Sequence, residues 1–345
     1  MNTSSNHFEI VGEHQKHIAL HADALLALAA DSPTEIKVVD IEAKSIRWTL
    51  PRNDSEIVRA RFSLNGSMAS VQYADKTISL YNVENGQASS FSAPTSEKVV
   101  SAEFNNDGER LLIVCENGAG FVYSSQDHSE ISQFQLPVTE EISRTSFVAG
   151  FMDDDSPVVG ALEKSQKSHR PTLRLFYPGT GSGNVIDLSI SPRRFEGHVQ
   201  LKGPWKSSDS HERYFIIGFN RGCSSMAMCG TTIFPGMGGI GDIDLIDPQT
   251  GEWVLEQEPG VGRRWKCEFS ADGKFVVVVD TCDPVRKALV YDVVTGRKLH
   301  HIEADSVEMG VASGGKFLVS AFSGALARKA SSYTYGLRYS ILNLP

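Results

Sequence analysis

The sequence predicts an all-β fold, because one pattern of short strands and tight turns recurs along most of the 345 residues. Three stretches support this expectation. Residues 58–86 read as three strands joined by two turns, residues 100–123 repeat the pattern 42 residues later, and residues 267–296 carry the clearest further copy. Three antiparallel strands alone have two open edges and little core, so each copy needs neighbours.

The first of these stretches shows why the residues favour strands. Apolar and polar residues alternate from Val58 to Phe62, which is the period of a half-buried strand. Asn65-Gly66 is a turn pair, since both residues tolerate a positive φ. A second strand is expected over 68–73 and a third over 78–83. A repeat of about 42 residues made of such strands is typical of the blades of a β-propeller.

Length and period together predict seven blades. The length divided by the period gives about eight, and two longer copies in the middle reduce the number to seven. The strand at residues 7–11 should pair with the last strand and close the ring, which removes the exposed edges. A single domain of four-stranded antiparallel blades results, at approximately 15–50, 55–95, 97–138, 144–192, 199–258, 263–303 and 306–342 plus 7–11.

Two segments fit the repeat less well. Residues 22–30 have the composition of a helix, but their place in the repeat predicts a strand. The fifth blade is the longest. We expect one strand over 214–219, an insertion over 220–241 and another strand over 242–247.

Charge and composition narrow the function classes. The net charge is −9 and the sequence pI is about 5.6, which argues against a nucleic-acid partner. We find no signal peptide and no run of 18 apolar residues, so no membrane insertion is expected. The five cysteines are an odd number without regular spacing, which predicts free thiols and a cytoplasmic location.

The turns of the repeat resemble a known family. The segments F-S-L-N-G-S (62–67), F-N-N-D-G-E-R (104–110) and F-S-A-D-G-K-F (269–275) resemble the "FSPDGK" turn of WD40 and YVTN-type propellers. No blade has the Trp-Asp pair of WD40 repeats, and Gly-His occurs once, at 197–198. The chain therefore resembles a divergent WD40-like propeller without an assigned subfamily. The positions of the Trp-Asp pair are taken by Val39-Asp40, Tyr81-Asn82, Ile246-Asp247 and Tyr291-Asp292.

Several motifs have a chemical and a structural interpretation. Two cysteines and two methionines in 223–229 could bind a soft metal, but soft side chains packed inside a blade are the favoured interpretation. The glycine-rich 234–241 lacks the Gly-Lys-Ser/Thr of a phosphate loop and is interpreted as a rim loop. Asp153-Asp154-Asp155 lacks the spacing of a calcium loop and is interpreted as a solvated turn. We therefore expect no metal and no cofactor.

The expected function is a non-catalytic protein–protein interaction scaffold, a subunit or adaptor that binds other proteins through rim loops of blades four and five. Trp and Arg are favoured interface anchors, although Trp side chains also pack between blades. The alternative is a lactonase-type hydrolase with a charged or metal site in the central channel, for which Glu163, His211, Arg221 and Arg264 are candidates. The expected partner-binding residues are Trp205, Arg221, Phe234, Met237, Arg263, Arg264 and Trp265.

Overall fold

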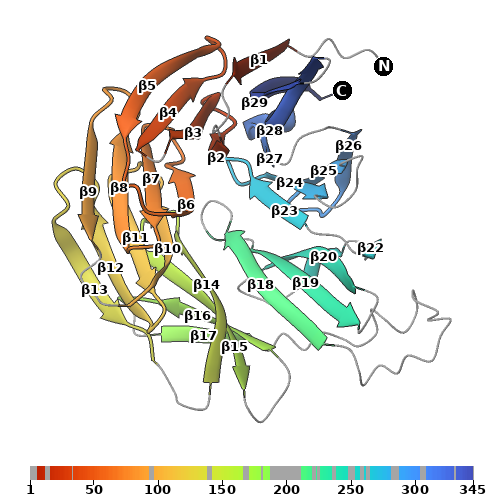
Figure 1. Cartoon of the computed structure of the whole chain (residues 1–345). Helices are drawn as coiled ribbons and strands as arrows, with labels where there is room; N and C mark the ends of the chain where they lie inside the picture. Colours follow the sequence, from red (N-terminus) through yellow and green to blue (C-terminus); the bar gives the residue numbers. More distant parts are fainter. Residues whose placement is uncertain are drawn as a thin grey trace.

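The computed structural model describes most of the chain. The described residues are 6–11, 16–32, 34–92, 97–137, 142–165, 171–179, 182–186, 211–219, 223, 226–234, 238–247, 253–256, 260–261, 265–280, 287–303, 308–329 and 332–344. Their regular secondary structure is dominated by β-strands, with a 3₁₀ turn at Ser313–Gly315. Figure 1 shows the strands grouped into small sheets around a common centre.

The first three sheets in chain order are four-stranded meanders in which each strand pairs antiparallel with the next. One contains β2 (Lys16–His21), β3 (Leu26–Ser32), β4 (Glu35–Asp40) and β5 (Ser45–Pro51). The next contains β6 (Ile57–Phe62), β7 (Met68–Tyr73), β8 (Thr77–Asn82) and β9 (Ala88–Ser92). The third contains β10 (Val99–Phe104), β11 (Arg110–Cys115), β12 (Ala119–Ser124) and β13 (Glu130–Gln135).

The next three sheets follow the same order. One contains β14 (Ile142–Phe151), β15 (Pro157–Ser165), β16 (Pro171–Tyr177) and β17 (Ser182–Ile186). The next contains β18 (His211–Phe219), β19 (Met226–Phe234), β20 (Gly238–Ile246) and β21 (Trp253–Glu256), with β22 (Gly260–Val261) paired to β20 as a fifth strand. The last of them contains β23 (Trp265–Phe269), β24 (Phe275–Asp280), β25 (Lys287–Asp292) and β26 (Lys298–Glu303).

The two ends of the chain share one sheet, as the sequence predicts. β27 (Glu308–Val311), β28 (Phe317–Lys329) and β29 (Ser332–Asn343) are consecutive, and β1 (Asn6–Val11) pairs antiparallel with β29 from Asn6↔Ile341 to Val11↔Gly336. The Arg338 guanidinium donates to a carboxylate oxygen of Glu9 across this pair, at 2.7 Å. The first and the last described strands are therefore neighbours although more than 300 residues separate them.

Apolar clusters join most neighbouring sheets, and β14 and β15 contact β18 at the remaining junction, which makes the arrangement a propeller. Ile78 and Leu80 of one sheet pack with Leu111 and Ile113 of its neighbour, and all four are at most 1% exposed. Further clusters of this kind join β2–β5 to β6–β9, β10–β13 to β14–β16, β20 to β23–β25, β24–β25 to β27–β28, and β28–β29 to β3–β4. The all-β propeller of antiparallel four-stranded blades is confirmed. Six sheets have four strands, and β22 extends the other to five.

The predictions for the two segments that fit the repeat less well, 22–30 and 220–241, differ in how they compare with the structure. Residues 22–25 form a turn and β3 follows, so the strand predicted there is confirmed despite a helix-forming composition. Cross-strand pairing and burial override local propensity, since Ala27, Leu28 and Ala29 are fully buried. The predicted insertion over 220–241 is wrong, because it contains β19, which pairs along nearly its whole length with both β18 and β20.

Candidate functional site

Four charged side chains face one another near the centre of the ring. Arg59 and Arg61 come from β6, and the Arg59 guanidinium lies 3.1 Å from the Glu103 carboxylate of β10. Arg61 lies 3.8 Å from Glu103 and 3.9 Å from Glu268 of β23. Three strands from different sheets therefore contribute to one network of alternating charge.

Three of these residues occupy the same place in the repeat. Arg61, Glu103 and Glu268 each directly precede the phenylalanine at the end of the first strand of their sheet. Arg61 and Glu103 are 42 residues apart, which is one period. Equivalent positions of neighbouring blades converge on the axis of a ring, so this shared position brings opposite charges together.

Burial and the three neighbouring charges act on the guanidinium of Arg59. The adjacent positive charge of Arg61, together with burial, lowers the pKa of Arg59 from its ordinary value, and the carboxylates of Glu103 and Glu268 act in the opposite direction. A guanidinium keeps its charge even with such a shift, because its ordinary pKa exceeds 12. A positive guanidinium therefore lies beside the carboxylate of Glu103.

A cavity of about 480 Å³ lies beside the network. Its walls come from β2, β6, β23 and β27 and are mostly apolar, with Phe62, Phe269 and Met309 among the lining residues. Arg61, Glu268 and His21 add polar groups. This volume and mixture are in the range of small-ligand sites.

Hydrogen bonds join the turns between the first and second strands of neighbouring sheets. His21 Nε2 donates to the carbonyl of Leu64 at 2.8 Å while its Nδ1 accepts from the backbone of Ala24, and these two bonds set the tautomer. Five further bonds link adjacent turns: Asn65 Nδ2 to Asp107 O (2.7 Å), Asn106 Nδ2 to Met152 O (3.3 Å), Cys223 Sγ to Phe151 O (3.4 Å), Asp272 N to Ser313 Oγ (3.1 Å) and Ser313 N to Asp23 Oδ1 (2.7 Å). These bonds fix the positions of the turns relative to one another.

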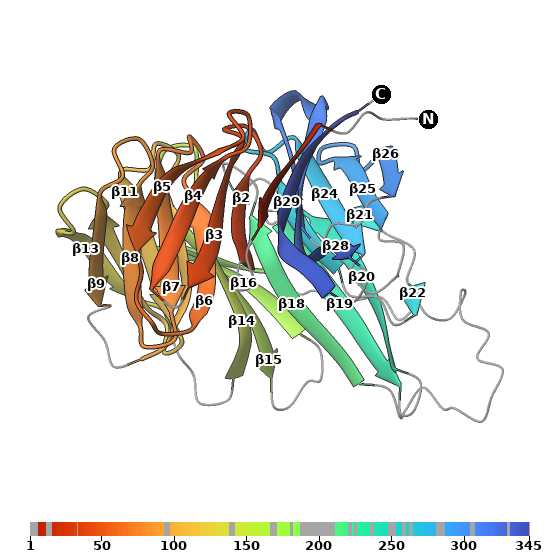
Figure 2. The ribbon, with the colours of Figure 1, turned by 45° about the horizontal axis from the view of Figure 1, so that its top comes forward.

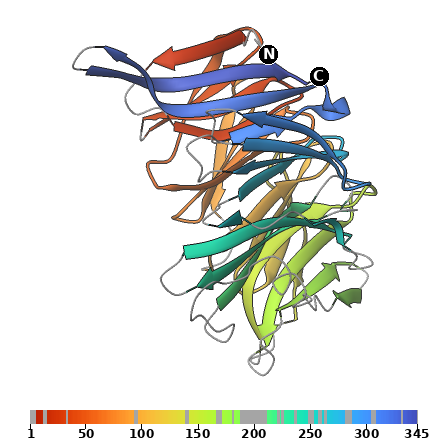
Figure 3. The same cartoon turned by 90° about the vertical axis from the view of Figure 1, so that its right-hand side faces the viewer.

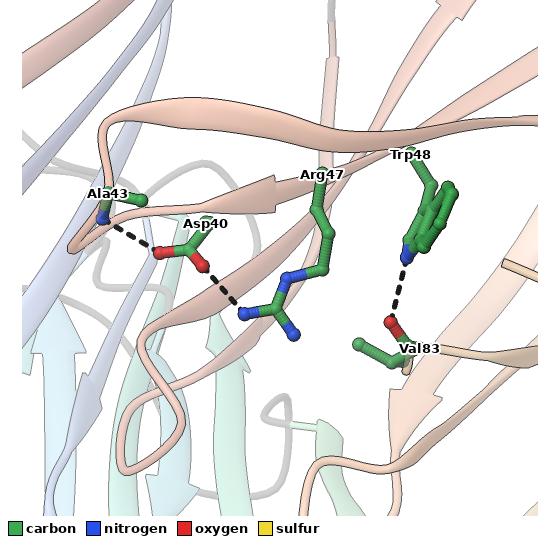
Figure 4. A network of polar contacts seen from close by, with 5 residues as sticks. All are labelled: Asp40, Ala43, Arg47, Trp48 and Val83. Carbon is green, nitrogen blue, oxygen red and sulfur yellow. Dashed lines mark hydrogen bonds and ion pairs between the residues drawn. The ribbon is translucent and has the colours of Figure 1, made fainter. Parts of the chain in front are cut away.

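Polar contacts also fix the outer turns (Figure 4). Asp40 accepts from the backbone of Ala43 and pairs with Arg47 at 2.6 Å, while Trp48 Nε1 donates to the carbonyl of Val83 in the next sheet at 2.9 Å. Partial burial raises the pKa of Asp40, but the bonds from Ala43 and Arg47 outweigh it and lower the pKa. Asp40 therefore caps the turn between β4 and β5.

The expected partner-binding residues are only partly placed. Phe234 ends β19 opposite Gly238, and Trp265 begins β23 opposite Asp280. The other five, Trp205, Arg221, Met237, Arg263 and Arg264, lie outside the described residues. Their role in binding stays a prediction.

The channel network differs from the set expected for a hydrolase. Glu163 lies in β15 opposite Arg144 and Thr172, and His211 begins β18, whereas Arg221 and Arg264 lie outside the described residues. The charged residues that meet in the channel, Arg59, Arg61, Glu103 and Glu268, were not predicted. Their shared place before the phenylalanine is a signal that could have found three of them.

The other motifs take structural places where the structure describes them. Met226 and Cys229 lie in β19, and the buried Cys223 precedes it, with a pKa raised by burial. Asp153–Asp155 form the turn between β14 and β15, and the backbone of Ser156 donates to Asp154. Within the described ranges, no three His, Cys, Asp or Glu side chains gather in a way that could hold a metal, and no helix has the length and hydropathy to cross a membrane.

Comparisons with known proteins assign no family to the chain. No protein-family model matches the chain, and no curated protein matches it. The propeller fold and the geometry described above therefore carry the functional argument.

Proposed function

We propose that this protein is a protein-interaction scaffold, a divergent WD40-like ring of seven blades that β1 closes by pairing with β29. In this proposal it works in the cytoplasm and binds another protein through the long blades built from β14–β17 and β18–β22. The observation that carries the proposal is the length of their strands. β14, β15 and β18–β20 have nine or ten residues, whereas β6–β8 and β10–β12 have six.

The extra length lies on one face of the ring. In each sheet the turn between the first and second strands lies on the face where hydrogen bonds join neighbouring turns. The turn between the second and third strands lies on the opposite face. Figure 2 shows β14, β15, β18 and β19 reaching beyond the strands of β2–β13 on one side. Strands that extend past the ring add exposed backbone and side chains without disturbing the core, which suits a binding surface on a rigid frame.

The channel supports a scaffold better than a hydrolase. Glu103 and Glu268 are each within 4 Å of an arginine, so both carboxylates form ion pairs between blades. A hydrolase needs a base or a metal ligand set that is open to its substrate. The hydrolase alternative is therefore not favoured.

The test is affinity purification from the native cell extract with a shortened hairpin. Gly230 pairs with Asp242, so replacing residues 231–241 by Asn-Gly shortens β19 and β20 while keeping their register. A second variant with Phe234→Ala and Met237→Ala keeps the length. We expect a stoichiometric partner that the shortened chain loses and the double substitution binds less well. Absence of any partner with the unaltered chain would refute the proposal.

A further inference from the structure

The hairpin of β28 and β29 is longer than the sheet to which it belongs. β27 pairs with β28 only from Leu318 to Ala321, and β1 pairs with β29 only from Gly336 to Ile341. The two long strands continue to pair with each other as far as Lys329↔Ser332. Residues 322–329 and 332–335, here called the arm, therefore form a two-stranded extension, and the hairpin reaches past its neighbours in Figure 3.

The arm lies in the longest stretch of the chain without a negative charge. None of the 42 acidic residues falls between Met309 and Pro345, which holds four basic residues, so the remaining 308 residues carry a net charge of −13. Two of the four, Arg328 and Lys329, are adjacent near the tip of the arm. Arg338 pairs with Glu9 inside the sheet, whereas Arg328 and Lys329 lie beyond the strands that carry acidic residues.

The backbone of the arm offers a long edge. In the described part of the chain, Phe322–Lys329 of β28 have no strand on the side where β27 pairs with the preceding residues. Eight residues at about 3.3 Å each span roughly 26 Å, and alternate residues of an edge strand direct their N–H and C=O groups outward. Such an edge is a template for another strand.

Charge selects among the strands that this edge could accept. Basic residues and a β-bulge protect edges from self-pairing, and the arm has both, with a register shift between Ala325 and Ala327. A second copy of the arm is repelled by its identical charge. An extended segment that carries carboxylates is instead attracted, because its charge is opposite to that of Arg328 and Lys329.

We propose that the arm binds an extended acidic segment of a partner protein, which adds as a strand to the edge of β28 beside Arg328 and Lys329. This inference rests on the proposed scaffold function and names the chemistry of one partner segment. A nucleic acid fits less well, since its phosphates extend past the arm toward a body with a net charge of −13. A short acidic peptide contacts the arm alone.

The test uses a fluorescein-labelled peptide of about eight residues that repeats Glu-Glu-Thr-Thr, so that glutamates lie on both faces of the added strand. Binding is measured by fluorescence anisotropy with the full chain. Arg328→Glu with Lys329→Glu reverses both charges. The matched control is Arg297→Glu with Lys298→Glu, because this exposed pair has the same two residues elsewhere in the chain. Melting temperatures within a few degrees of the unaltered chain establish that both variants fold.

Two further probes separate strand pairing from simple attraction. The first is the same peptide N-methylated at alternate residues, which removes the amides that pair with β28 while keeping its charge. The second is a single-stranded oligonucleotide of similar length. Hydrogen exchange at residues 322–329 reports pairing directly, because new hydrogen bonds slow the exchange of their amides.

The proposal predicts salt-sensitive binding, a loss of about tenfold with the arm variant and little change with the control. It also predicts no binding of the N-methylated peptide and slower exchange at 322–329. Equal losses in both variants, equal binding of the N-methylated peptide, no binding at all, or tighter binding of the oligonucleotide would each overturn it.

Its failure is distinguishable from failure of the scaffold function. If the cellular partner is retained by the arm variant and the peptide does not bind, the arm site is wrong and the scaffold function stands. If the peptide binds through the arm but no cellular partner is found, the scaffold function is wrong and the arm remains a peptide site.

Discussion

The sheets of β6–β13 and the sheets of β14–β22 have the same antiparallel strand order but strands of different length. The first group keeps six residues in each of its first three strands, and the second group uses up to ten. In the described residues of the second group, part of the extra length lies in the strands, where a longer hairpin pairs its own backbone groups. The comparison shows that the sheets that exceed the repeat length have longer strands. We therefore expect the short sheets to contribute most to the free energy of unfolding and the long sheets to bind the partner.

The largest expected effect is on the core between the short sheets. Ile113 is fully buried and packs with Ile78 and Leu80 of the neighbouring sheet. Ile113→Ala should lower the free energy of unfolding by about 3 kcal/mol, since it removes buried methyl groups and leaves a cavity. Urea denaturation measures this. The shortened β19–β20 hairpin should cost less, because the buried Leu245 remains, and an equal cost would break the comparison.

A second effect concerns the closest packing within a short sheet. A Cβ atom at Gly120 of β12 would overlap the ring of Phe134 on β13. Gly120→Ala should therefore destabilise the chain by about 2 kcal/mol, because the ring must move. The double variant with Phe134→Ala is the control. Calorimetry should show that it costs less than the sum of the two single changes, and strict additivity would contradict the contact.

A matched pair of glycines compares an outer turn of a short sheet with the turn between β27 and β28. Gly86 has φ +72° and its Cβ would meet Trp48 at 2.7 Å, whereas Gly314 has φ +79° and nothing within 4 Å. Both changes to alanine add the strain of a left-handed backbone, about 1 kcal/mol. Gly86→Ala should cost roughly 1 kcal/mol more, because of the indole. Equal shifts in the denaturation midpoint would show that this contact between blades is not tight.

The smallest effect is a carboxylate on the outer turn of a short sheet. Hydrogen bonds from Ser124 and Ser129 lower the pKa of Asp127 to about 2. Because the folded pKa is below the unfolded value, the stabilisation is present above about pH 4 and is lost as the pH falls toward 2. NMR titration of the carboxyl carbon should give this midpoint, and Ser129→Ala should raise it. A midpoint near 4 in the unaltered chain would contradict the bonds.

The repeating features were predictable from local sequence. The second strand of the unit was expected over 68–73 and lies at Met68–Tyr73, and the turn glycines Gly66, Gly86 and Gly108 have the positive φ that a tight turn requires. The pairing of both chain ends was also predictable, because an unpaired strand before the first repeat needs a neighbour. These inferences depend on short-range geometry that each copy of the repeat shows again.

The failures have a different origin. Residues 226–234 contain glycine and small residues without clear alternation, so β19 could not be recognised until β18 and β20 were seen on either side. The channel residues were missed because a charge at the end of a strand is ordinary on any exposed strand. The residues expected to bind a partner lie mostly outside the described ranges, so that prediction stands as it was made.

The sequence by itself determined the unit: strands by alternation, turns by glycine and asparagine, and neighbours by a period of 42 residues. Only the tertiary structure decided which charges meet. Arg61 and Glu268 are 207 residues apart and come within 3.9 Å because the ring brings the first strands of its blades to one axis. Local sequence encodes a blade, whereas the channel and the projecting arm arise from how the blades are joined.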